Sequence, residues 1–257
     1  MTRGFARGVA LVLGIAAASA ERRAAAGETA PKKDFAALAA AGRDALEHGD
    51  ALRAVDLLGE AAQGMPRDVT IKLSLALALE STRQLGPAAD TLLDALDIDD
   101  ADPRLHLRLG IVYAEMGKPE LASYARKEFA HALDRAPTDA DRSIACYQLG
   151  LLDEDDGKPD DALASYRTAL AADPSNGEAA NNAGLLLANA GKNDEAIALY
   201  RKAVAARPTL SVARLNLGLA LLRAGDSKAG RIEIEKLLAL PETDPLRARA
   251  KQLLAPH

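Results

Sequence analysis

The sequence is poor in large aromatic side chains: 3% of its 257 residues are aromatic, and tryptophan is absent. A conventional single core of this size uses more large side chains, so one compact globular domain is disfavoured. Hydrophobic residues still make up 49% of the chain, and alanine supplies much of that fraction. Because alanine has the highest helix propensity and lets helix axes approach, we expect closely packed helices.

Cysteine is almost absent as well. The single residue, Cys146, excludes an intrachain disulfide and any zinc site built from several cysteines. It falls on the core-facing side of an expected helix, where cysteine behaves as a small apolar residue. We therefore predict a packing role for Cys146.

Signals for catalysis, cofactors and nucleic acid are also missing. The net charge is −5 with no basic tract, so nucleic acid is not an expected partner. The sequence has no phosphate-binding glycine loop, serine nucleophile motif or Cys–His pair. We therefore predict neither an enzyme nor a cofactor.

Metal-binding patterns are equally weak. None of the four histidines is spaced four residues from another, so no metal site is expected among His48, His106, His131 and His257. The acidic runs 97–100 and 153–156 lack the alternating ligands and distal glutamate of a calcium loop. Turn formation and stabilisation of the next helix N-terminus explain these runs better.

The first 20 residues have the pattern of a secretory signal peptide. Two arginines precede an uncharged apolar run and an Ala-Ser-Ala sequence, which predicts cleavage between Ala20 and Glu21. The apolar run is too short to span a membrane as a helix. We expect export to a bacterial periplasm, transient membrane contact through residues 1–20 alone, and a linker over 21–34; an uncleaved anchor is the alternative.

A spacing of 34 residues recurs along the chain and sets its organisation. One ladder consists of Gly150, Ala162, Tyr166, Ala169 and Pro174, and it is repeated as Gly184, Ala196, Tyr200, Ala203 and Pro208. This order of small, aromatic and proline positions resembles the tetratricopeptide repeat. The resemblance implies an all-α, right-handed α-solenoid of helix-turn-helix repeats.

Extending the ladder in both directions gives six repeats. We number the positions of each repeat from its first residue, so that Gly150 is position 8, Ala162 is position 20 and Tyr166 is position 24. Small residues at positions 8 and 20 should let the two helices of a repeat approach, and the residue at position 24 should fill the space between repeats. Gly230, inside a helix of the sixth repeat, is expected to cost about 1 kcal/mol relative to alanine. The predicted repeats are 35–68, 69–102, 103–142, 143–176, 177–210 and 211–244, followed by a capping helix in 245–257.

Two repeats depart from the pattern. The second has Arg83 where the other turns have glycine. The third carries six additional residues, which we expect in a longer second helix and a longer connection. We also expect this irregular segment to contribute to the specificity of the protein.

The resemblance implies that partners bind a concave face lined by the first helix of each repeat, at positions 2, 5, 9 and 12. Two interpretations of positions 5 and 9 stay open: packing between neighbouring first helices, or a groove for an apolar or amphipathic segment. The residues at these positions are mostly apolar: Leu73, Leu77, Leu107, Ile111, Tyr147, Leu151, Asn181, Leu185, Leu215 and Leu219.

Some members of the family bind a partner's terminal carboxylate with lysine, asparagine and arginine. Here Arg104 and Arg108 match the final basic pair and join the candidate groove, but the upstream partners are missing. A carboxylate-clamp co-chaperone is therefore disfavoured. The function that we predict is a non-catalytic scaffold or adaptor that binds a protein or peptide. The alternatives are an assembly factor for an envelope machine such as a pilus or secretion system, and a signal-anchored, membrane-tethered protein.

Overall fold

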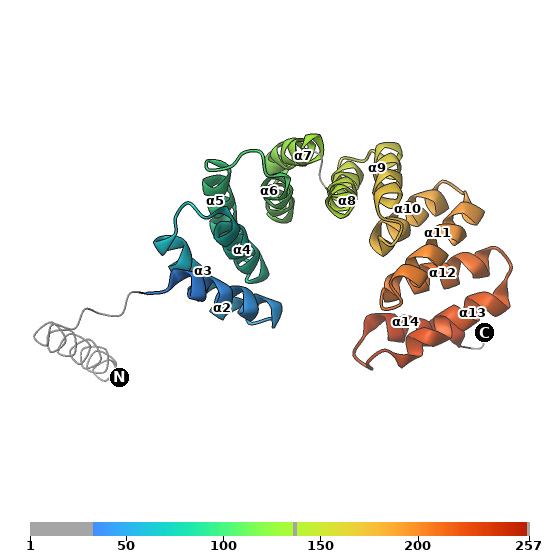
Figure 1. Ribbon diagram of the computed structural model, residues 1–257. Coiled ribbons are helices and arrows are strands. Elements are labelled where there is room, and N and C mark those ends of the chain that lie inside the picture. The colour runs from blue at the N-terminus through green and yellow to red at the C-terminus, as the bar shows by residue number, and fades with distance from the viewer. Residues whose placement is uncertain (1–32, 136–137, 256–257) are drawn as a thin grey trace, which may run out of the picture. The chain divides into compact units, whose positions relative to one another are not determined.

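The computed structural model describes residues 33–135 and 138–255 (Figure 1). These residues form 13 α-helices and one 3-10 helix, and they contain no strand. None of the described helices is both long and apolar enough to cross a membrane. The predicted signal peptide, 1–20, and its cleavage site between Ala20 and Glu21 lie outside the described residues.

The chain divides into two compact units, the first ending at Pro66 and the second beginning at Arg67. The first unit contains α2, Phe35–Glu47, and α3, Ala51–Gly64. These two helices approach closely, because a Cβ added to Gly42 would lie 2.6 Å from Leu58 Cγ.

The second unit continues the same pattern of helix pairs. Five pairs follow one another, and a 3-10 helix and a final helix come after them. The predicted fold class, six helix-turn-helix repeats and a C-terminal helix, is confirmed. The elements are α4 Val69–Ser81, α5 Leu85–Leu96, α6 Pro103–Glu115, α7 Pro119–Asp134, α8 Asp139–Asp155, α9 Pro159–Ala172, α10 Gly177–Asn189, α11 Asn193–Ala206, α12 Ser211–Arg223, α13 Ser227–Glu235, η1 Lys236–Ala239 and α14 Pro245–Leu254.

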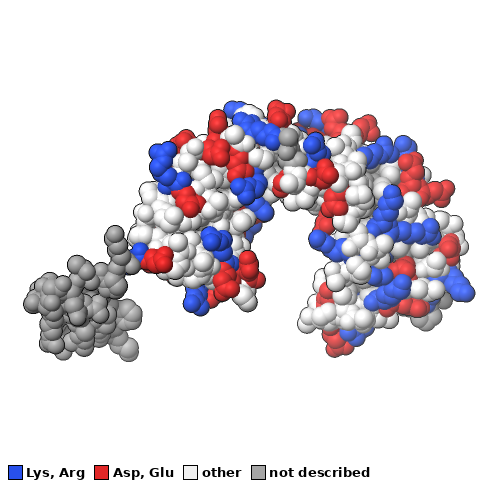
Figure 2. Space-filling model, viewed as in Figure 1, with Lys and Arg blue, Asp and Glu red and all other residues white. Residues whose placement is uncertain are grey.

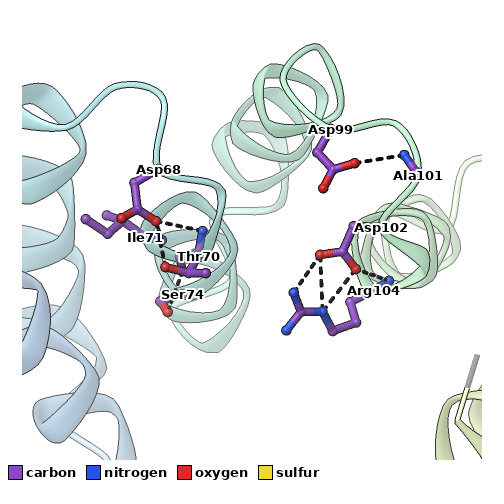
Figure 3. Close-up of polar contacts among 8 residues, drawn as sticks. All are labelled: Asp68, Thr70, Ile71, Ser74, Asp99, Ala101, Asp102 and Arg104. Atoms are coloured by element: carbon purple, nitrogen blue, oxygen red, sulfur yellow. Dashed lines mark hydrogen bonds and ion pairs between the residues drawn. The ribbon is translucent and has the colours of Figure 1, made fainter.

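Aspartates begin the first helices of the second and third repeats (Figure 3). Asp68 Oδ1 accepts hydrogen bonds from the backbone N–H groups of Thr70, at 2.9 Å, and Ile71, at 3.1 Å. Asp102 accepts from the Arg104 N–H at 2.9 Å, and proline occupies the first turn of α6. Each cap satisfies donors that a helix N-terminus leaves free, which contributes about 1 kcal/mol.

The turns between paired helices need a left-handed backbone conformation. Glycine provides it in five repeats, for example Gly117 at φ 63° and Gly225 at φ 89°. Arg83 occupies the equivalent place in the second repeat with φ 60°, and no other non-glycine among the described residues has positive φ. Arg83, which stands where the other repeats have glycine, is therefore a point of backbone strain.

In every repeat except the second, a glycine at position 8 packs against the residue at position 24 of the same repeat. A Cβ on Gly150 would lie 2.4 Å from the Tyr166 ring, and one on Gly184 would lie 2.8 Å from the Tyr200 ring. Tyr166 also belongs to a buried cluster with Ala179 of α10 in the next repeat. The aromatic position thus joins the two helices of one repeat and the neighbouring repeats.

The six extra residues of the third repeat lie in helices. α7 has 16 residues where α9 has 14, and α8 has 17 where α10 has 13, so the two differences account for all six. The prediction of a longer connection is wrong, because the extra residues before 143 lie in α8. This helix begins at Asp139, four residues before the predicted start of the repeat. Thr138 caps the new N-terminus by accepting a hydrogen bond from the Asp141 N–H.

Gly230 is required by packing, contrary to the expectation from helix propensity. A Cβ at this position would lie 2.8 Å from the Gly218 carbonyl oxygen and 2.8 Å from Leu222 Cγ. The contact with a backbone atom of α12 cannot be relieved by a side-chain rotation. Close approach of α12 and α13 therefore outweighs the lower helix propensity of glycine.

Candidate functional site

Three exposed apolar side chains lie on the first helices α8, α10 and α12. Ile144 is 36% exposed, Leu185 is 40% exposed and Val212 is 40% exposed. They occupy position 2 or 9 of their repeats, which are positions that the family resemblance assigns to partner binding. We call the surface formed by the following residues the first-helix face: Ile144, Tyr147, Leu151, Asn181, Leu185 and Val212.

Helical spacing gathers these side chains on one side of each helix. Ile144, Tyr147 and Leu151 follow one another at intervals of three and four residues along α8, and Asn181 and Leu185 are four apart on α10. Residues with these spacings share one side of a helix. The face therefore has an apolar side chain from each of three successive repeats.

Asparagines connect the helices that carry the face. Asn216 Nδ2 on α12 donates to Asn181 Oδ1 at 2.9 Å, and Asn181 Nδ2 donates to Asn182 Oδ1 at 3.0 Å. Asn181 is buried. Its amide is satisfied within the protein, so Asn181 holds α10 against α12.

A pocket of about 470 Å³ lies at the edge of the first-helix face. Ile144 and Tyr147 line it together with Asn176, Glu178 and Arg207. Arg207 forms an ion pair with Glu178 at the rim. The pocket therefore combines an apolar wall with both signs of charge, which suits an apolar side chain that lies beside a polar or charged group.

Tyr147 is held on the wall of this pocket by its neighbour in the core. Its ring centroid lies 5.8 Å from that of Tyr166, and the two planes are tilted by 36°. Burial raises the pKa of Tyr147, so its hydroxyl is neutral at physiological pH. Tyr147 can offer a partner both an aromatic surface and a hydroxyl.

Several predicted groove residues lie in the core. Leu107 and Ile111 are 3% and 7% exposed and pack in a cluster with Phe129. Leu215 is buried against Ile234. These three side chains therefore pack in the core, whereas Leu185 is 40% exposed. Partly buried members of the predicted groove are Leu73, Leu77, Tyr147, Leu151 and Leu219.

The two predicted basic groove residues are engaged by acids. Arg104 turns back onto its own N-cap, with Nη2 2.6 Å from Asp102 Oδ2 (Figure 3). The hydrogen bond from Arg104 holds the pKa of Asp102 below its ordinary value. Arg108 Nη1 lies 3.6 Å from Glu80 Oε2. Both guanidinium groups therefore already have carboxylate partners, which further disfavours a carboxylate clamp.

The acidic run 153–156 connects helices. Arg126 of α7 donates to Asp153 Oδ1 at 2.7 Å, and Ser165 of α9 donates to Asp153 Oδ2 at 3.1 Å. Asp156 accepts from both Arg126 and Lys158. These contacts make the run an inter-helix connection.

Cys146 lies in the core, as predicted. It is buried in a cluster with Ala162 and Tyr166. Burial raises the pKa of the Cys146 thiol, so the reactive thiolate is disfavoured.

The structure also brings together side chains that the sequence analysis kept apart. His106 of α6 lies beside Glu128 and His131 of α7, with the two imidazole centroids 5.1 Å apart. The test for histidines four residues apart missed the cluster, because His106 and His131 lie on two different helices of the third repeat. The available signal was Glu128 and His131 at a spacing of three, which places both on one side of a helix.

Charge is distributed without a large field of one sign on the side seen in Figure 2. Lysine and arginine alternate with aspartate and glutamate over the described helices in this view.

The sequence profile of the tetratricopeptide repeat family matches residues 39–103 and 147–211. No curated protein matches the chain. PilF of Pseudomonas aeruginosa is similar in structure, with a TM-score of 0.72 and 17% identity over 85% of this chain and 97% of that chain.

Two further solved structures are similar. PilW, described as a widely conserved type IV pilus biogenesis factor, has a TM-score of 0.70 and 17% identity over 86% of this chain and 98% of its own. YrrB, described as a repeat protein with an unusual peptide-binding site, has a TM-score of 0.53 and 22% identity over 76% of this chain and 97% of its own. At these identities the likeness shows the fold, an all-α repeat solenoid.

Proposed function

Because this chain belongs to the tetratricopeptide repeat family, we propose that it is a non-catalytic scaffold whose first-helix face binds a segment of another protein. The observation that carries the proposal is the exposure of Ile144, Leu185 and Val212 on successive first helices. Repeat solenoids present neighbouring helices as extended binding surfaces. An amphipathic helix or an extended peptide with regularly spaced apolar side chains fits such a surface.

The pocket beside Tyr147 refines the expected partner. An apolar side chain of the segment would enter between Ile144 and Tyr147, and an adjacent charged group would meet Glu178 or Arg207. The partly buried Asn181–Asn216 hydrogen bond supports this binding mode by keeping the two helices in fixed register before a partner arrives.

Capture from a cell-envelope extract tests the proposal with matched variants. Leu185→Glu places a charge on the first-helix face, and Leu93→Glu places one on α5, where the leucine is 44% exposed. We expect Leu185→Glu to reduce the captured partner at least tenfold while Leu93→Glu retains it, with both variants equally helical by circular dichroism. Equal capture by the two variants would show that the partner binds elsewhere.

A second proposal within this class is an assembly factor for an envelope machine such as a pilus. The likeness to PilF and PilW, together with the signal pattern in residues 1–20, favours testing it. Export to a bacterial periplasm is part of the proposal. N-terminal sequencing should find Glu21 first in a soluble periplasmic extract; an intact Met1 in the membrane fraction would instead support the anchored alternative.

A further inference from the structure

The third repeat contains two histidines and a glutamate that the proposed binding face does not use. His106 comes from α6, and Glu128 and His131 lie one helical turn apart on α7. One potential ligand atom from each residue lies within 4.8 Å of the other two. His106 is 5% exposed, and the other two side chains are partly buried.

Hydrogen bonds fix the tautomer of His106. Its Nε2 lies 2.9 Å from the backbone carbonyl oxygen of Asp100, which can only accept, so Nε2 carries a hydrogen. Arg135 Nε donates to the same carbonyl at 2.8 Å and helps to hold it in place. His106 Nδ1 faces Glu128 Oε2 at 2.6 Å. Metal-binding histidines have this arrangement, with one nitrogen anchored to a carbonyl and the other directed at the ion.

The sixth repeat has the same arrangement with permanently charged residues. Arg214 occupies the place of His106: it donates to the Pro208 carbonyl oxygen at 3.1 Å and to Glu233 Oε2 at 2.8 Å. Lys236 Nζ donates to Glu233 Oε1 at 2.6 Å. Lys236 follows Glu233 by three residues, just as His131 follows Glu128 by three. Arginine and lysine have no free electron pair at physiological pH, whereas imidazole has one.

We propose that His106, Glu128 and His131 form a binding site for a divalent transition-metal ion, with zinc as its probe. Two imidazoles and one carboxylate are a zinc-binding set, and they leave a fourth position for water or a donor from a partner. The two nitrogen ligands favour zinc over calcium or magnesium, which take oxygen ligands.

The geometry needs only side-chain adjustment. Ligand atoms around tetrahedral zinc lie roughly 3.3 Å apart, given metal–ligand distances of about 2.0–2.2 Å. The His106–Glu128 separation of 2.6 Å would widen, and the longest separation, at most 4.8 Å, would shorten. The ion takes the place of the proton that His106 and Glu128 share in the hydrogen bond.

Calorimetric titration of the tag-free, full-length protein with zinc chloride near pH 7 tests the site. We expect one zinc ion per chain and a thermal transition that moves upward when zinc is added, because the ion binds the folded state. Affinity should fall as the solution is made more acidic, because metal ligands must be deprotonated to bind the ion. His131→Ala and Glu128→Gln should each weaken binding at least tenfold, and His48→Ala should leave it unchanged.

The double variant His106→Arg/His131→Lys gives the third repeat the side chains of the sixth. We expect it to keep the helicity and melting temperature of the metal-free protein and to lose zinc binding, which separates loss of ligands from loss of fold. The proposal is overturned if wild type binds no zinc in this titration, or if the double variant binds it as tightly as wild type.

Discussion

In the third repeat Gly110 lies against Phe129, and in the sixth Gly218 lies against Ile234, so both pairs of helices approach at the same point. Their polar clusters are also in register, with His106 and Glu128 in one and Arg214 and Glu233 in the other. The packing of the two helices fixes where a polar side chain of the first helix contacts a glutamate of the second. The same contact can hold either an ion pair or a set of metal ligands, depending on the side chains present.

The core contacts of the two repeats give the largest expected effects. Phe129→Ala should lower the free energy of unfolding by about 3–5 kcal/mol, and Ile234→Ala by about 2–5 kcal/mol, because each leaves a cavity beside a glycine. Urea unfolding followed by circular dichroism measures both. A loss below about 1 kcal/mol at one site only would mean that the two cores are not equivalent.

Two partly buried glutamates, Glu80 beside the third repeat and Glu233 in the sixth, should respond to pH in opposite ways. Burial raises the pKa of Glu80 to about 7, near Arg108 of the third repeat. Ionisation is thus less favourable in the folded state, and stability should fall as pH rises from about 4.5 to about 7, by up to about 3 kcal/mol. Glu80→Gln should remove this loss and be more stable than wild type at pH 8.

Glu233 of the sixth repeat supplies the contrast. Although burial alone opposes it, hydrogen bonds and charge from Lys236 and Arg214 hold the pKa of Glu233 below its ordinary value. Its contribution is present at neutral pH and disappears as pH falls through the lowered pKa. Glu233→Gln should therefore cost about 1–2 kcal/mol at pH 7 and little in strong acid. Thermal melts from strong acid to pH 8 measure both effects. The contrast would be refuted if Glu80→Gln and Glu233→Gln changed the melting temperature in the same direction across this range.

The sixth repeat has Gly230 at position 20, where the first, second, fourth and fifth repeats have alanine. Gly230→Ala should destabilise the protein by roughly 1–2 kcal/mol, since the new Cβ meets the Gly218 carbonyl oxygen. Gly59→Ala in α3 is the control, because an added Cβ there meets nothing within 4 Å. The control should gain up to about 1 kcal/mol from helix propensity. Denaturant titration showing stabilisation of both would contradict the close approach.

The smallest effect concerns the turns. The third and sixth repeats turn at glycine, whereas Arg83 adopts φ 60° before α5. Arg83→Gly should raise stability by up to about 1 kcal/mol by relieving this strain. Its exposed ion pair with Glu115, at 2.7 Å, contributes little. A melting temperature below that of wild type would show that the pair matters more than the backbone.

The sequence predicted the repeat pattern because five of the six repeats share one contact, glycine at position 8 against the residue at position 24. It did not distinguish Ile111, which is buried, from Leu185, which is exposed, although both occupy position 9, because burial depends on the neighbouring repeat as well as on position. The requirement for Gly230 was hidden for the same reason: propensity is local, but the clash is with another helix. The cluster at His106 joins residues 22 and 25 apart in sequence, across the lengthened α7.

Site-specific photo-crosslinking in living cells tests the proposed binding face most directly. A photoreactive amino acid replaces Leu185 in one strain and Leu93 in another, and crosslinked proteins are identified by mass spectrometry. We expect one dominant crosslinked partner at Leu185 that is absent at Leu93. The same products at both positions, or none at Leu185, would contradict a binding surface on α8, α10 and α12.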